Sequence, residues 1–345
     1  MDHPLETSRS VRHKCAACFR QFNKIEHLVD HMRTSFHSVH EPICAICKKH
    51  CRSLDSLREH LIGPLPKQEC KNIFTTRGCK FCLAILDSPY SQRLHQERCQ
   101  FSGVNSGLLA RLANLGIRDA SIVVDGGRAR ATGTVALACK YVGGGGDGSL
   151  DICAKVCLID ETENVIFYSY VKPIIPVTNY RFETTGIRPE HLRDAMPLKQ
   201  VQKKIQEILY NGGEKARVLV GHGVEDDLKR LQIGYPIIRD TANYPPLMKT
   251  SKLCNSLKYL AQVYLGFDIQ NGIQDPYEDC VASMRLYKRM RSQVHKIEDY
   301  PMASDPQNKN NFGIWRQNEL ERMTPEHMLD ISRSDYYCWC LDLRI

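Results

Sequence analysis

Long apolar segments are absent from this sequence of 345 residues. A membrane-spanning helix needs about eighteen or more consecutive apolar residues, and no such run occurs, so we expect no transmembrane segment. The opening MDHPLETSRSVRHK also lacks the apolar core of a secretory signal. The hydrophobic content of 42% and the charged content of 25% are ordinary for a globular protein, which is the class that we expect.

The chain also has no excess of acidic residues, because its net charge is +8. Residues 1–105 hold sixteen Lys and Arg against ten Asp and Glu, so +6 of this charge lies in the first third of the chain. A basic segment favours an acidic partner such as nucleic acid, although a merely solvated basic surface would give the same count. Basic modules without an export signal favour the nucleus, with the cytoplasm as the alternative.

Cysteine is abundant and unevenly placed. Nine of the sixteen cysteines and nine of the thirteen histidines precede residue 100, and most of these cysteines form Cys-x2-Cys pairs. Without an export signal, this pattern favours metal binding in a reducing compartment over disulfides. A module of about thirty residues cannot fold on its own core, and a tetrahedral Zn²⁺ supplies the missing stability, about 10–16 kcal/mol.

Three repeats of the spacing Cys-x2-Cys-x12-His predict three small ββα zinc fingers within residues 1–100. In finger one the predicted ligands are Cys15, Cys18, His31 and His37. In finger three they are Cys79, Cys82, His95 and Cys99, with a cysteine in place of the last histidine. Phe22 and Leu28 occupy the small core of finger one.

Finger two lacks its second histidine. The spacing gives its first three ligands as Cys44, Cys47 and His60. The first candidate after them is Cys70, which we take as the fourth ligand. His50 and Cys51 are rivals, although Cys51 stands at the core position that Phe22 occupies in finger one and is expected to pack inside.

Base-reading arginines are absent from the fingers. Positions −1, 3 and 6 of a DNA-reading finger face the bases. In these fingers they are Lys24, His27 and Asp30, then Ser53, Ser56 and Glu59, then Ser88, Ser91 and Leu94. Without arginine for guanine, and with acids at two of the positions 6, RNA, other single-stranded nucleic acid or a protein partner is favoured over duplex DNA. Salt-sensitive phosphate contacts would come from Arg12, Lys14, Arg20, Lys48, Lys49 and Arg52.

The rest of the chain divides into three parts. Residues 101–131 are a linker, with a helical stretch at Leu108–Leu115 and a short strand at Ile122–Val124. Residues 132–293 form a second domain. Residues 294–345 are a tail whose aromatic end, Tyr336–Leu341, is expected to dock on that domain or else to bind a partner.

The second domain alternates strands and helices. The expected strands are Val135–Cys139, Asp151–Ile159, Val165–Val171 and Arg217–Gly221. The expected helices are Leu198–Leu209, Val224–Leu231, Leu253–Leu265 and Tyr277–Met290. The polar residues 160–164 predict an antiparallel hairpin, and the helices that follow predict an α/β fold with a mixed sheet flanked by helices.

Several runs in this domain carry a family resemblance. They are Ala136-Leu137-Ala138-Cys139-Lys140-Tyr141-Val142-Gly143, Val177-Thr178-Asn179-Tyr180, Gly186-Ile187-Arg188-Pro189-Glu190, Val220-Gly221-His222, Asp226-Asp227-Leu228-Lys229, Ile238-Arg239-Asp240-Thr241, Ser256-Leu257-Lys258 and Glu278-Asp279. In this order they resemble the DEDDh 3′–5′ exonucleases, and within them the RNA exonuclease 4-like branch, over roughly half the chain. The resemblance implies a ribonuclease-H-like (DnaQ-like) fold.

The resemblance also implies a catalytic site, in which four carboxylates hold two divalent metal ions and a histidine acts as the general base. The retained catalytic positions are Asp227 and Asp279. Ala138 and Lys140 stand where the family has its first two carboxylates, at i and i+2 on one face of a strand. Gln274 stands where the family has its histidine. Three of the five positions are therefore changed.

The changed positions predict impaired catalysis. Two aspartates would hold Mg²⁺ or Mn²⁺ poorly in the nuclease-like site, and glutamine cannot act as a base near neutral pH. We expect the ammonium group of Lys140 to replace the lost metal and to neutralise both Asp227 and Asp279, because two unpaired carboxylates would repel each other. It should lie within about 4 Å of one of them. The alternative is a decayed site in which all of these groups are solvated.

The sequence thus predicts a nucleic-acid binding protein, with RNA as the favoured ligand and a catalytically impaired exonuclease-like domain. Arg188 and Lys258 could contact phosphates. One alternative is an active 3′–5′ exoribonuclease with an atypical metal site, for which Asp147, Asp151 and Asp226 are the acids that could substitute. Another is an adaptor that recruits proteins through its fingers and tail.

Overall fold

The computed structural model describes residues 12–15, 20–34, 42–49, 51, 53–99, 101–102, 122–123, 133–213, 215–248, 253–293, 321–324 and 337–344. Several sequence predictions concern residues outside these ranges. They are the helical stretch Leu108–Leu115, Val124 of the predicted short strand, the ligands Cys18 and His37, the rival ligand His50, the basic Arg52 and Tyr336 of the aromatic end. The domain boundaries drawn from the sequence stay predictions.

A mixed sheet forms the centre of the molecule, as the sequence predicts. Its strands are β3 (Ile122–Val123), β4 (Thr134–Gly144), β5 (Leu150–Asp160), β6 (Val165–Lys172), β9 (Val218–Gly221) and β10 (Ile238–Asp240), in the order β10-β9-β4-β5-β6-β3. The strands β4, β5 and β6 are an antiparallel meander, and β9 pairs parallel with both β4 and β10. Shorter strands, β7 (Val177–Asn179) and β8 (Met196–Pro197), pair with β4 and β6.

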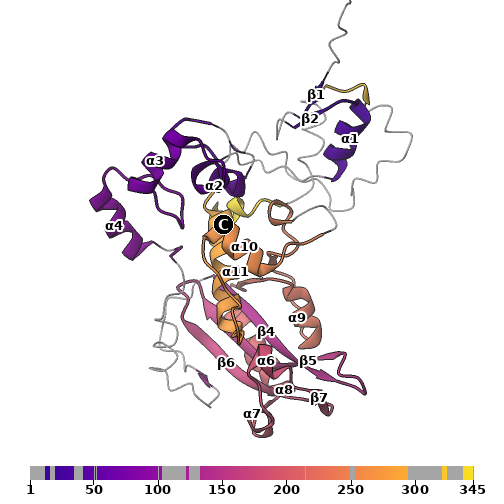
Figure 1. Ribbon diagram of the computed structural model, residues 1–345. Coiled ribbons are helices and arrows are strands. Elements are labelled where there is room, and N and C mark those ends of the chain that lie inside the picture. Colours follow the sequence, from indigo (N-terminus) through magenta and orange to yellow (C-terminus); the bar gives the residue numbers. More distant parts are fainter. Residues whose placement is uncertain are drawn as a thin grey trace, which may run out of the picture.

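Helices cover both faces of the sheet. They are α8 (Leu198–Tyr210), α9 (Val224–Arg230), α10 (Leu257–Leu260), the π-helical turn η3 (Ala261–Leu265) and α11 (Pro276–Arg291). Because side chains alternate along a strand, β4 sends Ala136 and Ala138 into the core beneath α10, η3 and α11. Leu137 and Cys139 enter the core beneath α8 and α9. Figure 1 shows α11, in orange, running from the side of the fingers down onto the sheet.

One predicted helix begins later than the sequence suggests. The apolar pattern predicts a helix over Leu253–Leu265, whereas α10 starts at Leu257, after Ser256 accepts a hydrogen bond from the amide of Tyr259. This N-cap fixes the start of the helix. The helix then widens into η3 and ends at Gly266, whose φ of +79° is a conformation that glycine adopts readily. The brief helices α6 (Phe182–Thr185), α7 (Pro189–Arg193), η1 (Asn211–Gly213) and η2 (Pro245–Leu247) are too short to give a periodic signal.

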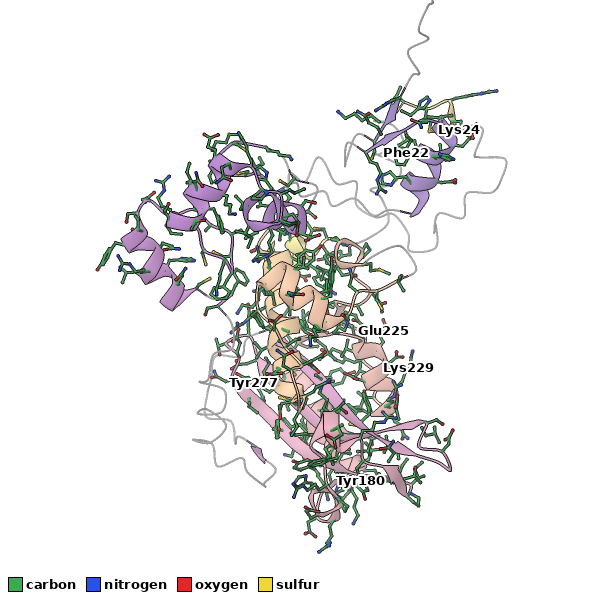
Figure 2. The ribbon with its side chains drawn as sticks, viewed as in Figure 1. Phe22, Lys24, Tyr180, Glu225, Lys229 and Tyr277 are labelled. Carbon is green, nitrogen blue, oxygen red and sulfur yellow. The ribbon has the colours of Figure 1, made fainter. Side chains whose placement is uncertain are left out.

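The fingers hold the helices α1 (Ile25–Thr34), α2 (Leu54–Ile62), α3 (Gln68–Arg77) and α4 (Pro89–Arg98). Finger one is a ββα unit, with β1 (His13–Lys14) and β2 (Gln21–Phe22) ahead of α1. Leu28 is buried in it, and the ring of Phe22 lies 5.1 Å from that of His31. Figure 2 shows Phe22 and Lys24 in this finger, apart from the sheet domain. Fingers two and three keep the Cys-x2-Cys turn and the helix, and α3 is an addition to finger two.

The end of the chain docks on the sheet domain, as expected of its aromatic residues. In η5 (Trp339–Arg344), the ring of Trp339 stacks on Tyr244 with ring centroids 3.8 Å apart. The Asp342 carboxylate accepts hydrogen bonds from Nε and Nη2 of Arg239 at 2.9 and 2.7 Å, and from the Tyr287 hydroxyl at 2.8 Å. Within the described residues, no helix has the length and apolarity that crossing a membrane would require.

Candidate metal centres and carboxylate site

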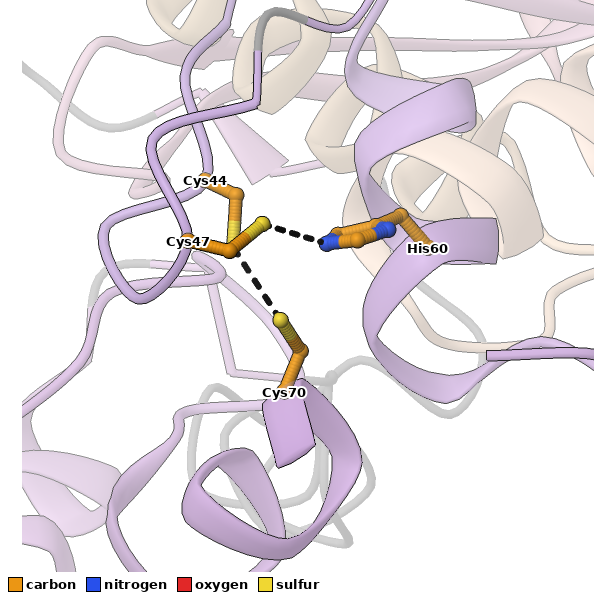
Figure 3. Close-up of side chains that lie close together, drawn as sticks. All are labelled: Cys44, Cys47, His60 and Cys70. Carbon is orange, nitrogen blue, oxygen red and sulfur yellow. Dashed lines mark hydrogen bonds between the residues drawn. The ribbon is translucent and has the colours of Figure 1, made fainter. Parts of the chain in front are cut away.

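Two clusters of thiols and imidazoles lie in fingers two and three. The first is Cys44, Cys47, His60 and Cys70, and the second is Cys79, Cys82, His95 and Cys99. In each cluster the ligand atoms lie within 4.8 Å of one another. The structure therefore brings Cys70, which α3 carries, to the other three ligands of finger two (Figure 3). The rival Cys51 is buried in the finger core beside Leu57 instead.

The spacing of these ligand atoms fits zinc. The Sγ atoms of Cys44 and Cys70 are 3.9 Å apart, and those of Cys79 and Cys99 are 3.8 Å apart. Tetrahedral zinc with Zn–S bonds of about 2.3 Å would place two sulfurs about 3.8 Å apart. The Nε2 atom of His60 lies 3.3 Å from the Cys47 sulfur, as a tetrahedral site with one imidazole also requires. In finger one the structure describes two of the four predicted ligands, Cys15 and His31.

The carboxylate of Asp279, at the start of α11, is held by a lysine. The Nζ atom of Lys140 lies 2.6 Å from Oδ2 of Asp279, and both residues are buried. Lys140 also donates to Oε1 of Gln274 at 3.2 Å, and Nε2 of Gln270 donates to Oδ1 of Asp279 at 2.9 Å. The prediction that Lys140 lies within salt-bridge distance of a retained carboxylate is confirmed, and the alternative of a solvated lysine is wrong.

The second retained carboxylate is stabilised differently. The hydroxyl of Tyr141 donates a hydrogen bond to Oδ1 of Asp227. Burial raises the pKa of Asp227 to about 7, and the nearby charges of Asp240 and Asp279 also raise it, whereas the Tyr141 hydrogen bond lowers it. The hypothesis that Lys140 neutralises both aspartates needs a correction. Its second polar contact is Gln274, and Asp227 is stabilised by a tyrosine and by retention of its own proton near neutral pH.

Strand β4 explains why two consecutive residues reach different carboxylates. The pairing of β4 with β5 is irregular between Lys140 and Tyr141. Lys140 pairs with Lys155, whereas Tyr141 pairs with Cys153. Lys140 follows Ala138 by two residues and therefore points to the face of the sheet that α11 covers. Tyr141 packs against the core on the opposite face, where α9 carries Asp227.

The other acidic residues do not restore an oxygen-ligand set. Asp226 is exposed and pairs with Lys229 at 3.1 Å, on the outer side of α9 where Figure 2 shows Lys229. Asp151 pairs with Arg181 at 2.7 Å, and Asp147 is an exposed turn residue. Among the residues that the structure describes, only the two finger clusters bring three or more His, Cys, Asp or Glu ligand atoms together. The donors around Asp279 thus differ from the octahedral oxygen set that Mg²⁺ prefers.

A third buried acid next to this site escaped the sequence analysis. Asp275 accepts hydrogen bonds from Nζ of Lys155 at 2.8 Å and from the Tyr168 hydroxyl at 2.7 Å. Burial raises the pKa of Asp275, but the charge of Lys155 and the hydrogen bonds from Lys155, Tyr168 and the Tyr277 amide together leave the pKa below its usual value. Asp275 also caps α11 through the amide of Tyr277. The sequence signal was Asp275 followed by Pro276, a typical start of a helix.

The zinc clusters predict a metal stoichiometry. We expect native mass spectrometry of the full chain to find three zinc ions, and Cys70→Ala to reduce the number to two, because Cys70 completes the finger-two cluster. The matched control is Cys51→Ala, which removes a buried thiol of the same finger and should leave three ions. Loss of an ion from the Cys51 variant, with none lost from the Cys70 variant, would contradict the assignment.

The raised pKa of Asp227 predicts a pH dependence of stability. Between its ordinary value of 3.8 and about 7 the folded protein holds a proton that the unfolded chain has released, so stability falls as the pH rises. We expect Asp227→Asn to abolish about 2–3 kcal/mol of the decrease in unfolding free energy between pH 5 and pH 8, measured by urea denaturation. The exposed neighbour provides the control, because Asp226→Asn should keep the wild-type decrease. An unchanged decrease in Asp227→Asn would refute this assignment.

Comparison with known proteins agrees with this geometry. The family model of the exonucleases, RNase_T, matches residues 143–287, a stretch that begins after Ala138 and Lys140. RNA exonuclease 4 of Xenopus laevis is 41% identical over 159 residues, which are 45% of this chain and 37% of that protein. RNA exonuclease 4 of Homo sapiens is 37% identical over 171 residues, 49% of this chain and 39% of that protein. The chain thus spans less than half the length of these two relatives.

Among solved structures, the Saccharomyces cerevisiae Pan2 pseudoubiquitin hydrolase–RNA exonuclease module in complex with A7 RNA has a TM-score of 0.42 and 28% identity, over 48% of this chain and 30% of that chain. The identification therefore depends on the sequence relatives, on the matched family and on the mixed sheet with its two retained aspartates. The sheet domain of this chain is therefore similar to the exonuclease family over residues 143–287 and to the RNA exonuclease 4 proteins over about half of the chain, and we call it the exonuclease-family domain.

Proposed function

We propose that this protein binds RNA through its exonuclease-family domain and does not hydrolyse it by a two-metal mechanism. The observation that carries the proposal is the buried ion pair between Lys140 and Asp279, 2.6 Å apart. A divalent ion bound to Asp279 would have to displace the ammonium group, which already neutralises the carboxylate. Two ions that act on a phosphodiester need several oxygen ligands each, and Ala138 supplies none.

The side chains around the ion pair further oppose metal binding. Both carboxylate oxygens of Asp279 accept hydrogen bonds. Lys140 donates to Oδ2, and Gln270 donates to Oδ1. Asp227 retains its proton up to a pH of about 7, and a metal would have to displace that proton together with the Tyr141 hydrogen bond. Gln274 offers an amide that cannot take a proton from water. Each of these contacts stabilises the site without a dication.

Two exposed cationic side chains of the domain favour a phosphate-bearing ligand. Arg188, the N-cap of α7, lies over the ring of Phe182, 5.1 Å from its centroid, and 3.8 Å from the carboxylate of Glu190. Lys258 donates to Asn271 at 3.0 Å, and Asn271 lies in the same loop as Gln274. Guanidinium and ammonium groups bind backbone phosphates in a salt-dependent way. RNA, the class of nucleic acid in the names of the relatives, is therefore the ligand that we propose.

The binding proposal is tested with RNA oligonucleotides at several salt concentrations. We expect the affinity to fall as salt rises, and the double variant Arg188→Ala/Lys258→Ala to weaken binding and to reduce the salt slope by about two phosphate contacts. The control is Lys203→Ala/Lys204→Ala on α8, which removes the same charge from exposed positions elsewhere. Salt-independent binding of RNA, or no binding, would favour the adaptor alternative. Tighter binding of single-stranded DNA than of RNA would identify single-stranded DNA as the ligand.

The impairment of catalysis is tested by digestion with Mg²⁺ or Mn²⁺. We expect the unaltered chain to leave a 3′-labelled RNA intact, and the variant Ala138→Asp/Lys140→Glu/Gln274→His to shorten it, because that variant regains two carboxylates and a base. Adding Asp279→Asn to this variant should abolish the gain and is the control for a contaminating nuclease. Release of nucleotides by the unaltered chain, lost in its Asp279→Asn variant, would favour the active-enzyme alternative.

Partners and compartment complete the proposal. The fingers and the docked end of the chain offer surfaces for protein partners, and the basic first third of the chain favours the nucleus over the cytoplasm. Imaging of the tagged full chain in cells would decide between the two compartments.

A further inference from the structure

Fingers two and three pack against the exonuclease-family domain. Cys79 and Cys99 of finger three belong to the same buried core as Met290 of α11, and Leu54 of finger two packs against that core. Gly266 marks the closest approach, because a Cβ atom there would lie 2.9 Å from both Nη1 of Arg58 and the carbonyl oxygen of Lys80. These two fingers are therefore bound to the domain and are not separate modules on a flexible tether.

Arginines make the polar contacts of this interface. Arg289 of α11 donates to the carbonyl oxygens of Phe81 and Cys82 at 3.0 and 3.4 Å. Arg58 of finger two donates to the carbonyl oxygen of Lys80 at 2.6 Å and to that of Val263, in η3, at 2.5 Å. The carbonyls of Lys80, Phe81 and Cys82 belong to the turn Cys79–Cys82. A zinc ion would fix this turn through its two cysteines.

Arg289 has no acidic partner among the residues that the structure describes. Its side chain is buried with 4% of its surface exposed, and within the described part of the chain it forms no ion pair with a carboxylate. Its Nε atom has no hydrogen-bond partner there either. A buried guanidinium without a counter-charge is strongly unfavourable. Among the described residues, the charge is therefore balanced by a group other than Asp or Glu.

A zinc-loaded finger three would supply that charge. Three thiolates, one neutral imidazole and Zn²⁺ sum to a formal charge of −1. A finger with two cysteines and two histidines would sum to zero. The Cys82 ligand belongs to the turn whose carbonyls Arg289 contacts. A zinc-loaded centre therefore places this negative charge next to Arg289.

We propose that the zinc–thiolate centre of finger three is the counter-ion of the buried Arg289, so that zinc binding docks finger three on α11 and stabilises the exonuclease-family domain. This coupling does not depend on whether the domain cleaves or only binds RNA. It makes α11 responsive to zinc at its C-terminal end.

Hydrogen exchange of the full chain, followed by mass spectrometry, tests this coupling. We expect peptides from α11 (residues 276–291) to exchange about tenfold faster or more in Cys82→Ser than in the unaltered chain, because charge-assisted hydrogen bonds are lost. The control is Cys15→Ser, which removes a predicted ligand of finger one and should leave α11 unchanged. Equal protection of α11 in the unaltered chain and in Cys82→Ser would overturn the proposal.

A second pair of variants separates charge from simple packing. Cys99→His keeps four zinc ligands but brings the formal charge of the centre to zero. We expect it to speed exchange of α11 in the unaltered background, and to have no further effect in Arg289→Met, where no charge needs balancing. Arg291→Met is the matched control, because Arg291 pairs with Glu161 and not with the finger. The same acceleration by Cys99→His in the Arg289→Met and Arg291→Met backgrounds would show packing alone and refute the counter-ion role.

Discussion

The ion pair between Lys140 and Asp279 is the contact on which the arrangement of the carboxylate site depends. A mixed sheet and helix α11 bring these residues together at a place where the exonuclease family is expected to hold metal ions. The fold survives the change, because the ammonium group supplies a positive charge to a carboxylate that would otherwise be buried alone. Strand β4 carries Lys140 and therefore affects both the stability of the site and its chemistry. Tyr141, the next residue, stabilises Asp227 through a hydrogen bond and adds no full charge.

Helix α11 connects the two halves of the molecule. Its first turn carries Asp279, and its last turn carries Arg289, which contacts the carbonyls of finger three. Between them the helix packs on β4, β5 and β9. A helix of 16 residues held at both ends by charged contacts has little freedom to shift. The finger region and the carboxylate site therefore share one rigid element.

Much of the fold could be predicted because its signals are local. Apolar alternation gave the three strands of the meander, and helical periodicity gave α8, α9 and α11. The start of α10 was missed, because the cap at Ser256 outweighs the apolar residues before it. The ligand Cys70 could be inferred by elimination, since no second histidine follows His60. The strands β7, β8 and β10 have two or three residues each, and the sheet determines them more than their own sequence does.

The site itself was predictable only in part. Matching positions 138, 140, 227, 274 and 279 to a family pattern identified the changed residues and the Lys140 contact. The roles of Tyr141 and Asp275 escaped prediction, because they depend on contacts with Asp227 on α9 and with Lys155 across the sheet. Such contacts join residues far apart in sequence, and no local pattern announces them. The docking of the fingers was missed for the same reason, since Arg58 and Val263 are separated by 205 positions.

The close contact at Gly266 changes how this protein should be divided for study. A cut in the linker at residues 101–131, where the sequence suggests a boundary, would strip finger side chains from the core beneath α11 and leave Arg289 facing water. The excised piece would then expose apolar surface that the intact chain covers, which promotes aggregation. Fingers two and three share a buried core with α11, so a fragment that retains this core would keep both fingers together with the sheet domain.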